Sequence, residues 1–206
     1  GFDDIIVGAP RAGFDAQGSG ASYVVFGKAS GFASTIDLSS LNGTTGFRLD
    51  GVSVNDRSGR SVSAAGDVNG DGFDDIIVGA YLADDEAGSS YVVFGKASGF
   101  ASSIDLSSLN GTTGFRLDGT AANDRSGTSV SAAGDVNGDG FDDVIVGAPR
   151  VDFVGKSGVG SSYVVFGKAS GFASSIDLSG LDGTTGFRLD GVVAVDQSGT
   201  SVSAAG

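Results

Sequence analysis

Short apolar runs, each bounded by Gly, Asn, Asp or Ser, recur along the whole chain. In the middle of the sequence four of them are rich in β-branched and aromatic residues, at 61–66, 75–80, 90–95 and 114–118. Runs of this length between turn-forming residues are typical of β-strands. No segment keeps a 3.6-residue apolar period, and only residues 104–109 are expected to make one helical turn. The pattern therefore predicts an all-β protein.

The runs belong to a unit that occurs three times. Gly-Phe-Asp-Asp begins at residues 1, 72 and 140, and Ser-Val-Ser-Ala-Ala-Gly begins at 61, 129 and 201. Such periodicity marks a repeat architecture. We therefore expect a single module over residues 1–206, with units at about 1–66, 67–134 and 135–206. One stretch in each unit varies freely: 11–20, 82–89 and 150–161.

The residues at successive positions 76–78, Ile-Ile-Val, are all apolar. Because successive side chains of a strand point to opposite faces, both faces of this strand are expected to be buried. Four antiparallel strands with such a run suit a sheet that lies between two neighbouring sheets, as in a propeller blade. The prediction is a β-propeller of four-stranded antiparallel blades, with three blades per chain. Because propellers typically have four to eight blades, we expect the chain to be a fragment or to assemble with another copy.

A nine-residue motif, Asp-Val-Asn-Gly-Asp-Gly-Phe-Asp-Asp, carries the most specific chemistry. Asp67, Asn69, Asp71 and Asp75 place side-chain oxygens at positions 1, 3, 5 and 9, and the carbonyl of Phe73 stands at position 7. Ca²⁺ collects six to eight such oxygens around a tight turn, with glycine at position 6. The second loop has the same residues: Asp135, Asn137, Asp139, the carbonyl of Phe141, and Asp143.

Two other structures, an EF-hand and a plain turn, use similar residues. An EF-hand needs a bidentate Glu at position 12, where this chain has Val78 or Val146. A plain Asn/Asp/Gly turn would use the same residues. Three carboxylates on one short turn repel each other unless a cation is bound, so the sequence favours Ca²⁺ as the cofactor.

With these motifs the chain resembles FG-GAP repeats, the propeller blades of integrin alpha chains and of many bacterial surface proteins. The resemblance is carried by Gly8-Ala9-Pro10, by Gly147-Ala148-Pro149 and by the two aspartate loops. It implies a calcium site between the first and second strands of a blade. The chain departs from the family pattern at the Phe-Gly element, which here is Ser58-Gly59, Ser126-Gly127 and Ser198-Gly199, and at Gly79-Ala80-Tyr81.

Charge and composition exclude several functions. The formal net charge is −13, which excludes the basic surface that a nucleic acid or an anionic membrane requires. No apolar run is long enough to span a membrane, so membrane insertion is not expected. Cysteine is absent, so no disulfide framework can form. An acidic, calcium-bound protein suits the millimolar calcium outside cells, and we expect an extracellular or cell-surface location.

The sequence also argues against catalysis. Without His and Cys, a Ser-His-Asp triad, a Cys-His dyad and a His-bound zinc site are impossible. Gly155-Lys156-Ser157 lacks the earlier glycine of a phosphate-binding loop. Asp84-Asp85-Glu86 offers paired carboxylates, but the other units lack this cluster, which favours a charged loop tip. Asn42 and Asn110 match the glycosylation pattern, and a turn is favoured there.

The predicted function is adhesion or ligand binding without catalysis, with an unknown protein or glycan held by the variable loops. The alternatives are a purely structural or assembly module and a non-catalytic domain of a larger secreted enzyme. We also expect a homodimer in which two chains exchange strands to close a six-bladed ring.

Overall fold

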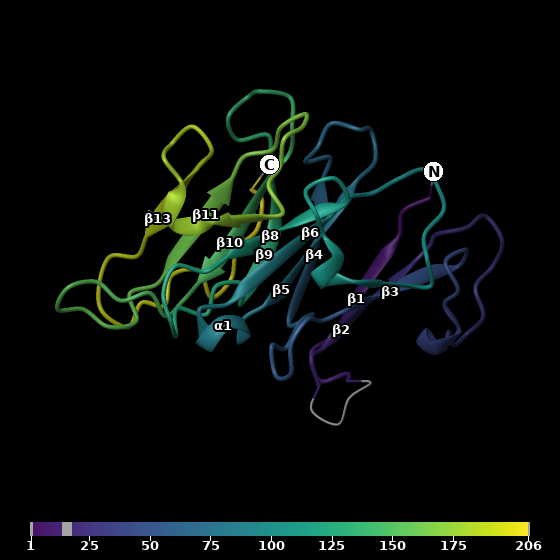
Figure 1. Cartoon of the computed structure of the whole chain (residues 1–206), viewed down its shortest axis with the longest axis horizontal. Helices are drawn as coiled ribbons and strands as arrows, with labels where there is room; N and C mark the ends of the chain where they lie inside the picture. Colours follow the sequence, from purple (N-terminus) through teal and green to yellow (C-terminus); the bar gives the residue numbers. More distant parts are fainter. Residues whose placement is uncertain (1, 14–17, 206) are drawn as a thin grey trace.

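The computed structural model describes residues 2–13 and 18–205, and these residues form three β-sheets that lie side by side (Figure 1). In spatial order the first sheet contains β1 (Ile5–Ala9), β2 (Ala21–Val25), β3 (Gly46–Asp50) and β7 (Ser103–Asp105). The second contains β12 (Ser175–Asp177), β8 (Gly114–Asp118), β6 (Ser89–Val93), β5 (Asp75–Ala80) and β4 (Ser61–Gly66). The third contains β13 (Gly186–Asp190), β11 (Ser161–Val165), β10 (Asp143–Ala148) and β9 (Ser129–Gly134). The all-β prediction is confirmed.

Sheets do not coincide with the units of the sequence. The last strand of one unit pairs antiparallel with the first strand of the next, as where Val62 of β4 lies opposite Val78 of β5. The short strands β7 and β12 run parallel to β3 and β8 of the sheet before them. The predicted antiparallel four-stranded blade is therefore correct only in part, because the first two sheets each include one short parallel strand.

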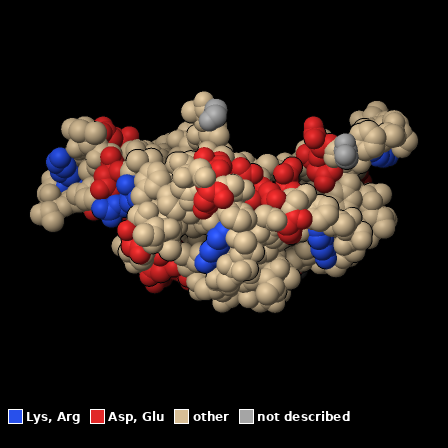
Figure 2. Space-filling view, turned by 90° about the horizontal axis from the view of Figure 1, so that it is seen from above, with Lys and Arg blue, Asp and Glu red and all other residues tan. Residues whose placement is uncertain are grey.

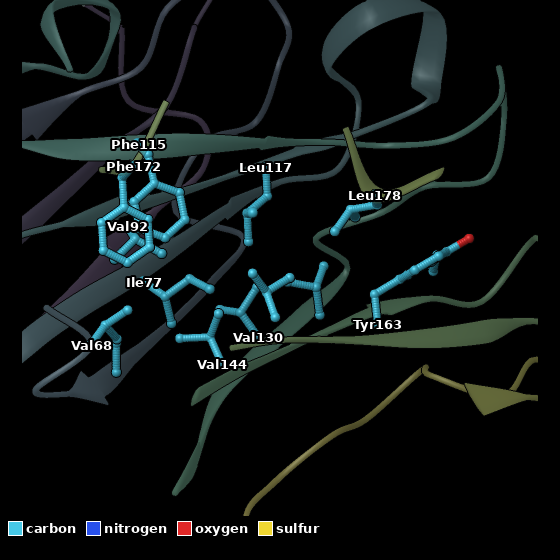
Figure 3. Packing of buried hydrophobic residues seen from close by; sticks show 14 of the residues in the cluster. Val68, Ile77, Val92, Phe115, Leu117, Val130, Val144, Tyr163, Phe172 and Leu178 are labelled. Carbon is cyan, nitrogen blue, oxygen red and sulfur yellow. The ribbon is translucent and has the colours of Figure 1, made fainter. Parts of the chain in front are cut away.

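The core fills the spaces between successive sheets. Figure 3 shows Ile77 of β5 and Leu117 of β8 packed near Val130 and Val144 of the third sheet. Val78, the next residue along β5, belongs to a second cluster together with Phe47 of the first sheet. Successive residues of β5 thus face different neighbours, which confirms that this strand is buried on both faces.

Helical structure is limited to single turns in the described part of the chain. The turn expected at 104–109 is a 3₁₀-helix, with counterparts in the other units: Leu38–Ser40, Leu106–Ser108 and Leu178–Gly180. Asp105 caps the middle one by accepting the Ser107 N–H at 2.8 Å. The turn α1 (Ala83–Glu86) has positive φ at Asp84, Asp85 and Glu86, so it is not a regular helix.

Aspartate loops and variable segments lie at opposite ends of the sheets. The loop 67–75 leads into β5, and the segment 82–89 follows the same strand. In Figure 1, α1 accordingly lies on the opposite side of the molecule from the N- and C-termini. Among residues 2–13 and 18–205, no helix has the length and apolar character needed to cross a lipid bilayer.

Candidate metal centre

The aspartate loops are shaped by hydrogen bonds from their own backbone to their side chains. Asp67 accepts the N–H of Asp71 at 3.0 Å and that of Gly72 at 2.8 Å. Asp71 accepts the N–H of Phe73 at 2.9 Å. Gly72 has φ +87°, which glycine adopts without steric cost. The side chains at positions 1 and 5 therefore point toward the inside of the turn.

The second loop repeats this geometry. Asp135 accepts the N–H of Asp139 at 3.0 Å and that of Gly140 at 2.9 Å. Asn137 donates its amide to Asp139 at 2.8 Å, as Asn69 donates to Asp71 in the first loop at 3.0 Å. Two stretches 68 residues apart thus fold alike because their side-chain chemistry is the same.

The aspartate at position 9 is buried. Asp75 is 1% exposed, and it accepts the N–H of Val68 at 3.0 Å and that of Gly95 at 2.8 Å. Asp143 is likewise buried and accepts from Val136 and Gly167, each at 2.9 Å. Each carboxylate therefore ties its loop to the second residue after β6 or β11.

Within the part of the chain that the structure describes, neither buried carboxylate forms an ion pair with Lys or Arg. Burial and, to a lesser degree, the negative charges of Asp71 and Asp67 raise the pKa of Asp75 to about 7, although the two accepted N–H groups lower it. Burial raises the pKa of Asp143 too, with the same contribution from Asp139 and Asp135. The carboxylates at positions 1, 5 and 9 are thus close enough to repel one another.

Each loop thus combines side-chain oxygens, several negative charges and a tight turn, which suits the binding of a hard cation. The side chains are not gathered into a finished shell, however. Within residues 2–13 and 18–205, no three acidic side chains converge tightly enough to hold a metal ion. The oxygens of Asp67, Asn69 and Asp71 accept backbone N–H groups of the loop instead. Phe73 and Phe141 occupy position 7 of the two loops.

One residue that couples the two loops was missed by sequence reasoning. Asp142 accepts the N–H of Asp67 at 2.8 Å, across 75 residues of sequence. The backbone of Asp142 also donates to the carbonyl of Asp67 at 3.2 Å. The sequence contained a sign of this contact, because aspartate occupies both position 8 and position 9 of each loop. The sequence analysis proposed a role only for the aspartate at position 9.

The carboxylates make one face of the molecule acidic. Figure 2 shows Asp and Glu side chains gathered over the middle of the face seen from above, with few Lys or Arg among them.

The variable segments form the other end of the sheets. In the second unit Glu86 forms an ion pair with Arg125, whose Nε lies 2.8 Å from Oε2 of Glu86. The N–H of Asn123 donates to the carbonyl of Asp85 at 3.2 Å. The cluster Asp84-Asp85-Glu86 is thus a loop tip bound to a neighbouring loop. Residues 14–17 of the first variable segment lie outside the described residues.

The remaining sequence motifs have structural roles here. The Lys156 ammonium donates to the carbonyl of Val192 at 3.0 Å. Asn42 accepts the N–H groups of Thr44 and Thr45 at 3.0 and 3.1 Å, and so forms the turn that the sequence favoured.

Comparison with known proteins supports the family. The model of the FG-GAP repeat family matches residues 58–93 and 126–165. Over 82% of its length the chain is 31% identical to integrin alpha-PS2 of Drosophila melanogaster, covering 12% of that protein. It is 33% identical to integrin alpha pat-2 of Caenorhabditis briggsae over 97% of its length, covering 16% of that protein. With human integrin alpha-IIb the identity is 34% over 74% of the chain, and 15% of the integrin is covered.

The chain therefore spans less than a fifth of the length of the integrins that it matches. Both family matches run from the Ser-Gly element to the third strand of a sheet, and both contain an aspartate loop. Two segments of the chain match the FG-GAP repeat family, and most of its sequence is similar to a part of integrin alpha chains.

Proposed function

We propose that the chain is a calcium-stabilised β-propeller module of an extracellular or cell-surface protein, which binds a ligand without catalysis. Three sheets side by side, each apolar on the faces toward its neighbours, support the propeller. The similarity to integrin alpha chains supports adhesion and the extracellular location. The absence of His and Cys from the sequence supports a non-catalytic role.

The buried carboxylates of Asp75 and Asp143 are the observation that carries the calcium proposal. Each lies close to two further carboxylates of its own loop, and that repulsion opposes folding at neutral pH. Bound Ca²⁺ would supply two positive charges and take oxygens from positions 1, 3, 5, 7 and 9 of the loop. The ion would thereby join the entry of β5 or β10 to the strand before it.

Thermal unfolding of the whole chain in Ca²⁺ and in EGTA tests this proposal. Binding to the folded state alone adds about 2.7 kcal/mol per site at a hundredfold excess over Kd. Two sites would add about 5 kcal/mol, which raises the Tm of a chain of this size by roughly 10–20 °C. An unchanged Tm would contradict the proposal.

A matched pair of variants assigns the effect to the loops. Asp71→Asn keeps an oxygen that can accept the Phe73 N–H but removes a charge. We expect it to lose about half of the calcium-dependent rise in Tm. Asp105→Asn makes the same chemical change at an exposed helix cap outside the loops and should keep the full rise. An equal loss of the calcium-dependent rise in Tm in both variants would mean that calcium stabilises the chain by screening its net negative charge and not by binding in the loops.

We assign ligand binding to the variable end, because a rigid sheet scaffold with changeable loops is a common design of binding proteins. The class of ligand is a protein or a glycan. Protein and glycan arrays probed with the calcium-loaded chain test this assignment. Replacement of the tip Asp84-Asp85-Glu86 by Asn-Asn-Gln should alter the bound set, while Asp105→Asn should not. Identical binding by both variants would remove the variable end as the ligand site.

A further inference from the structure

The two aspartate loops, 67–75 and 135–143, lie against each other although they belong to different units. A Cβ built at Gly70 in the first loop would clash with the ring of Phe141 in the second. Gly138 has the same place in the second loop and a similar φ, +76° against +72°, but no atom lies within 4 Å of a Cβ built there. The close approach at Gly70 therefore comes from the neighbouring loop and not from the loop's own fold.

Asp142, at position 8 of the second loop, makes the first connection between the loops. Its carboxylate accepts the N–H of Asp67 at 2.8 Å, and its own N–H donates to the carbonyl of Asp67 at 3.2 Å. A Cβ at Gly66, the residue before Asp67, would clash with the Asp142 carboxylate. The second loop thus holds both backbone polar groups of the residue at position 1 of the first loop.

A second connection runs through Val68. The N–H of Val68 donates to the buried carboxylate of Asp75 at 3.0 Å, and its carbonyl accepts the N–H of Lys168 at 3.0 Å. Lys168 follows Gly167, whose N–H donates to the buried carboxylate of Asp143 at 2.9 Å. The position-9 carboxylates of the two loops are therefore joined by a short series of hydrogen-bonded peptide groups.

This second connection is firmly packed. Val68 is 1% exposed and lies in the core cluster with Ile77 and Val144 (Figure 3). A Cβ at Gly167 would clash with the carbonyl oxygens of both Asp142 and Val68, so three backbone segments approach closely there. Because close-packed interiors transmit displacements, ordering of one loop is expected to reach the other.

Asp74 offers a contrast with Asp142 within the same motif. It occupies position 8 of the first loop, as Asp142 does in the second. Asp74 is exposed, and in the described part of the chain its carboxylate makes no hydrogen bond or ion pair. Asp142 is half-buried against Asp67. Two aspartates with the same place in the sequence motif thus differ in their contacts.

We propose that the two loops bind Ca²⁺ as a coupled pair, in which Asp142 of the second loop positions Asp67 of the first. The coupling rests on the calcium sites proposed above and adds a dependence between them. Ca²⁺ in the second loop holds Asp143 and the adjoining Asp142 in place, so less order remains to be imposed on the first loop when it binds its own ion. Coupling between two sites is reciprocal, so each ion strengthens the binding of the other by the same factor.

Repulsion between the two cations acts in the opposite direction. Each loop has carboxylates at positions 1, 5 and 9, so a loop with one bound Ca²⁺ remains negatively charged. At physiological ionic strength salt screens exposed charges over about 8 Å. The contribution of the shared contacts therefore dominates under these conditions. Coupling between two sites is typically about 5- to 150-fold, and a factor of about five or more is expected here.

Two single-site variants and the wild-type chain measure the coupling. Asp139→Asn disables the second loop and reports the affinity of the first, while Asp71→Asn disables the first loop and reports the affinity of the second. Calorimetric titration with Ca²⁺ at physiological ionic strength gives one association constant for each variant and an overall constant for both sites of the wild type. Without coupling, the overall constant equals the product of the two single-site constants. We expect it to exceed that product by about fivefold or more.

Variants of Asp142, each made in the wild-type and single-site backgrounds, assign the coupling to its contact with Asp67. Asp142→Ala removes the acceptor of the Asp67 N–H, and the excess over the product should disappear. Asp142→Asn removes the same charge but keeps an oxygen that can accept this N–H, so it should keep the excess. Asp74→Ala, the matched change in the first loop, should keep it too.

Circular dichroism in EGTA checks that each variant is folded. Asp142 is half-buried at the surface of a loop, so Asp142→Ala should keep the sheets. The comparison of the wild type with the two single-site variants needs no change at Asp142 and tests the coupling independently of it.

Each way of failing has its own result. An overall constant equal to or below the product would overturn the coupling while leaving the two calcium sites in place. An excess that survives Asp142→Ala, or that Asp142→Asn also loses, would overturn the positioning role of Asp142. Absence of Ca²⁺ binding in both single-site variants would overturn the proposed calcium sites and the coupling with them.

Discussion

The two ends of the sheets are held together by different groups. At the aspartate end, side chains make the contacts, as where Asp67 accepts two N–H groups of its own loop. At the variable end, backbone meets backbone: the N–H of Ser126 donates to the carbonyl of Ala87 at 2.9 Å, and that of Asn123 donates to Asp85. Contacts made by backbone groups tolerate different side chains. This difference explains why one end repeats its sequence and the other changes it.

Glycine shows the same contrast. Gly20, Gly88 and Gly160 lie at or next to the ends of the three variable segments, and a Cβ at each would clash with the backbone of a serine in the Ser-Gly element. All three have positive φ. The variable end thus keeps glycine at a position where two backbones approach closely.

The largest expected effect is that of Gly88→Ala. A positive φ costs an L-residue about 1–2 kcal/mol, and the clash with the Ser126 carbonyl adds overpacking of about 1–3 kcal/mol. The control is Gly72→Ala in the aspartate loop, where φ is also positive but no atom lies within 4 Å. Urea unfolding should show the larger loss for Gly88→Ala. Equal losses would mean that the close approach contributes nothing.

Removal of one loop side chain should have the next largest effect. Asp67→Ala leaves the Gly72 N–H without its acceptor and the Asp71 N–H with Asn69 alone, and the two lost hydrogen bonds contribute about 1–3 kcal/mol in total. The measurement is urea unfolding in EGTA, so that lost calcium binding does not contribute. An unchanged free energy of unfolding would show that these bonds do not shape the folded loop.

Replacement of the tip Asp84-Asp85-Glu86 by Asn-Asn-Gln should cost less. Asn tolerates positive φ and the backbone contacts stay, so the main loss is the partly exposed ion pair of Glu86 with Arg125, at about 1 kcal/mol or less. Urea unfolding again provides the measurement. A loss as large as that of Asp67→Ala would contradict the distinction between the two ends.

The smallest effect concerns pH. Burial raises the pKa of Asp124, which accepts the Thr120 hydroxyl at 2.7 Å. The unfolded chain then loses this proton at lower pH than the folded chain does, so ionisation lowers stability as pH rises from about 4 through the folded pKa. Asp124→Asn should unfold with a smaller decline over this range. A steeper decline in the variant would contradict the assignment.

Much of the fold was predictable because it rests on local sequence. The strands at 61–66, 75–80 and 114–118 have the predicted bounds, since apolar runs and turn residues both mark them. The parallel strands β7 and β12 were missed, because three residues carry no periodicity and their partners lie in another unit. A hint was available in Ile36, Ile104 and Ile176, an isolated isoleucine at the same place in each unit.

In the candidate site, too, local contacts could be predicted from the sequence and contacts between units could not. Loop positions 1, 3 and 5 could be proposed from sequence because Asp67, Asn69 and Asp71 accept N–H groups of the same short loop. Asp75 at position 9 also accepts the N–H of Gly95, 20 residues away, which the sequence did not indicate. The contact of Asp142 with Asp67 was not, because it joins two units and depends on how the sheets lie together. Whether the oxygens of the loop bind Ca²⁺ stays a prediction.

The crossing strands also set an order of events during synthesis. Leu49 of β3 pairs with Ile104 of β7, which ends at Asp105, 55 residues after the end of β3 at Asp50. At a translation rate of about 5–20 residues per second, the ribosome needs roughly 3–11 s to deliver that strand. The apolar edge of each of the first two sheets therefore stays exposed until its crossing strand has been synthesised. During that time a chaperone or a neighbouring nascent chain can bind to the edge.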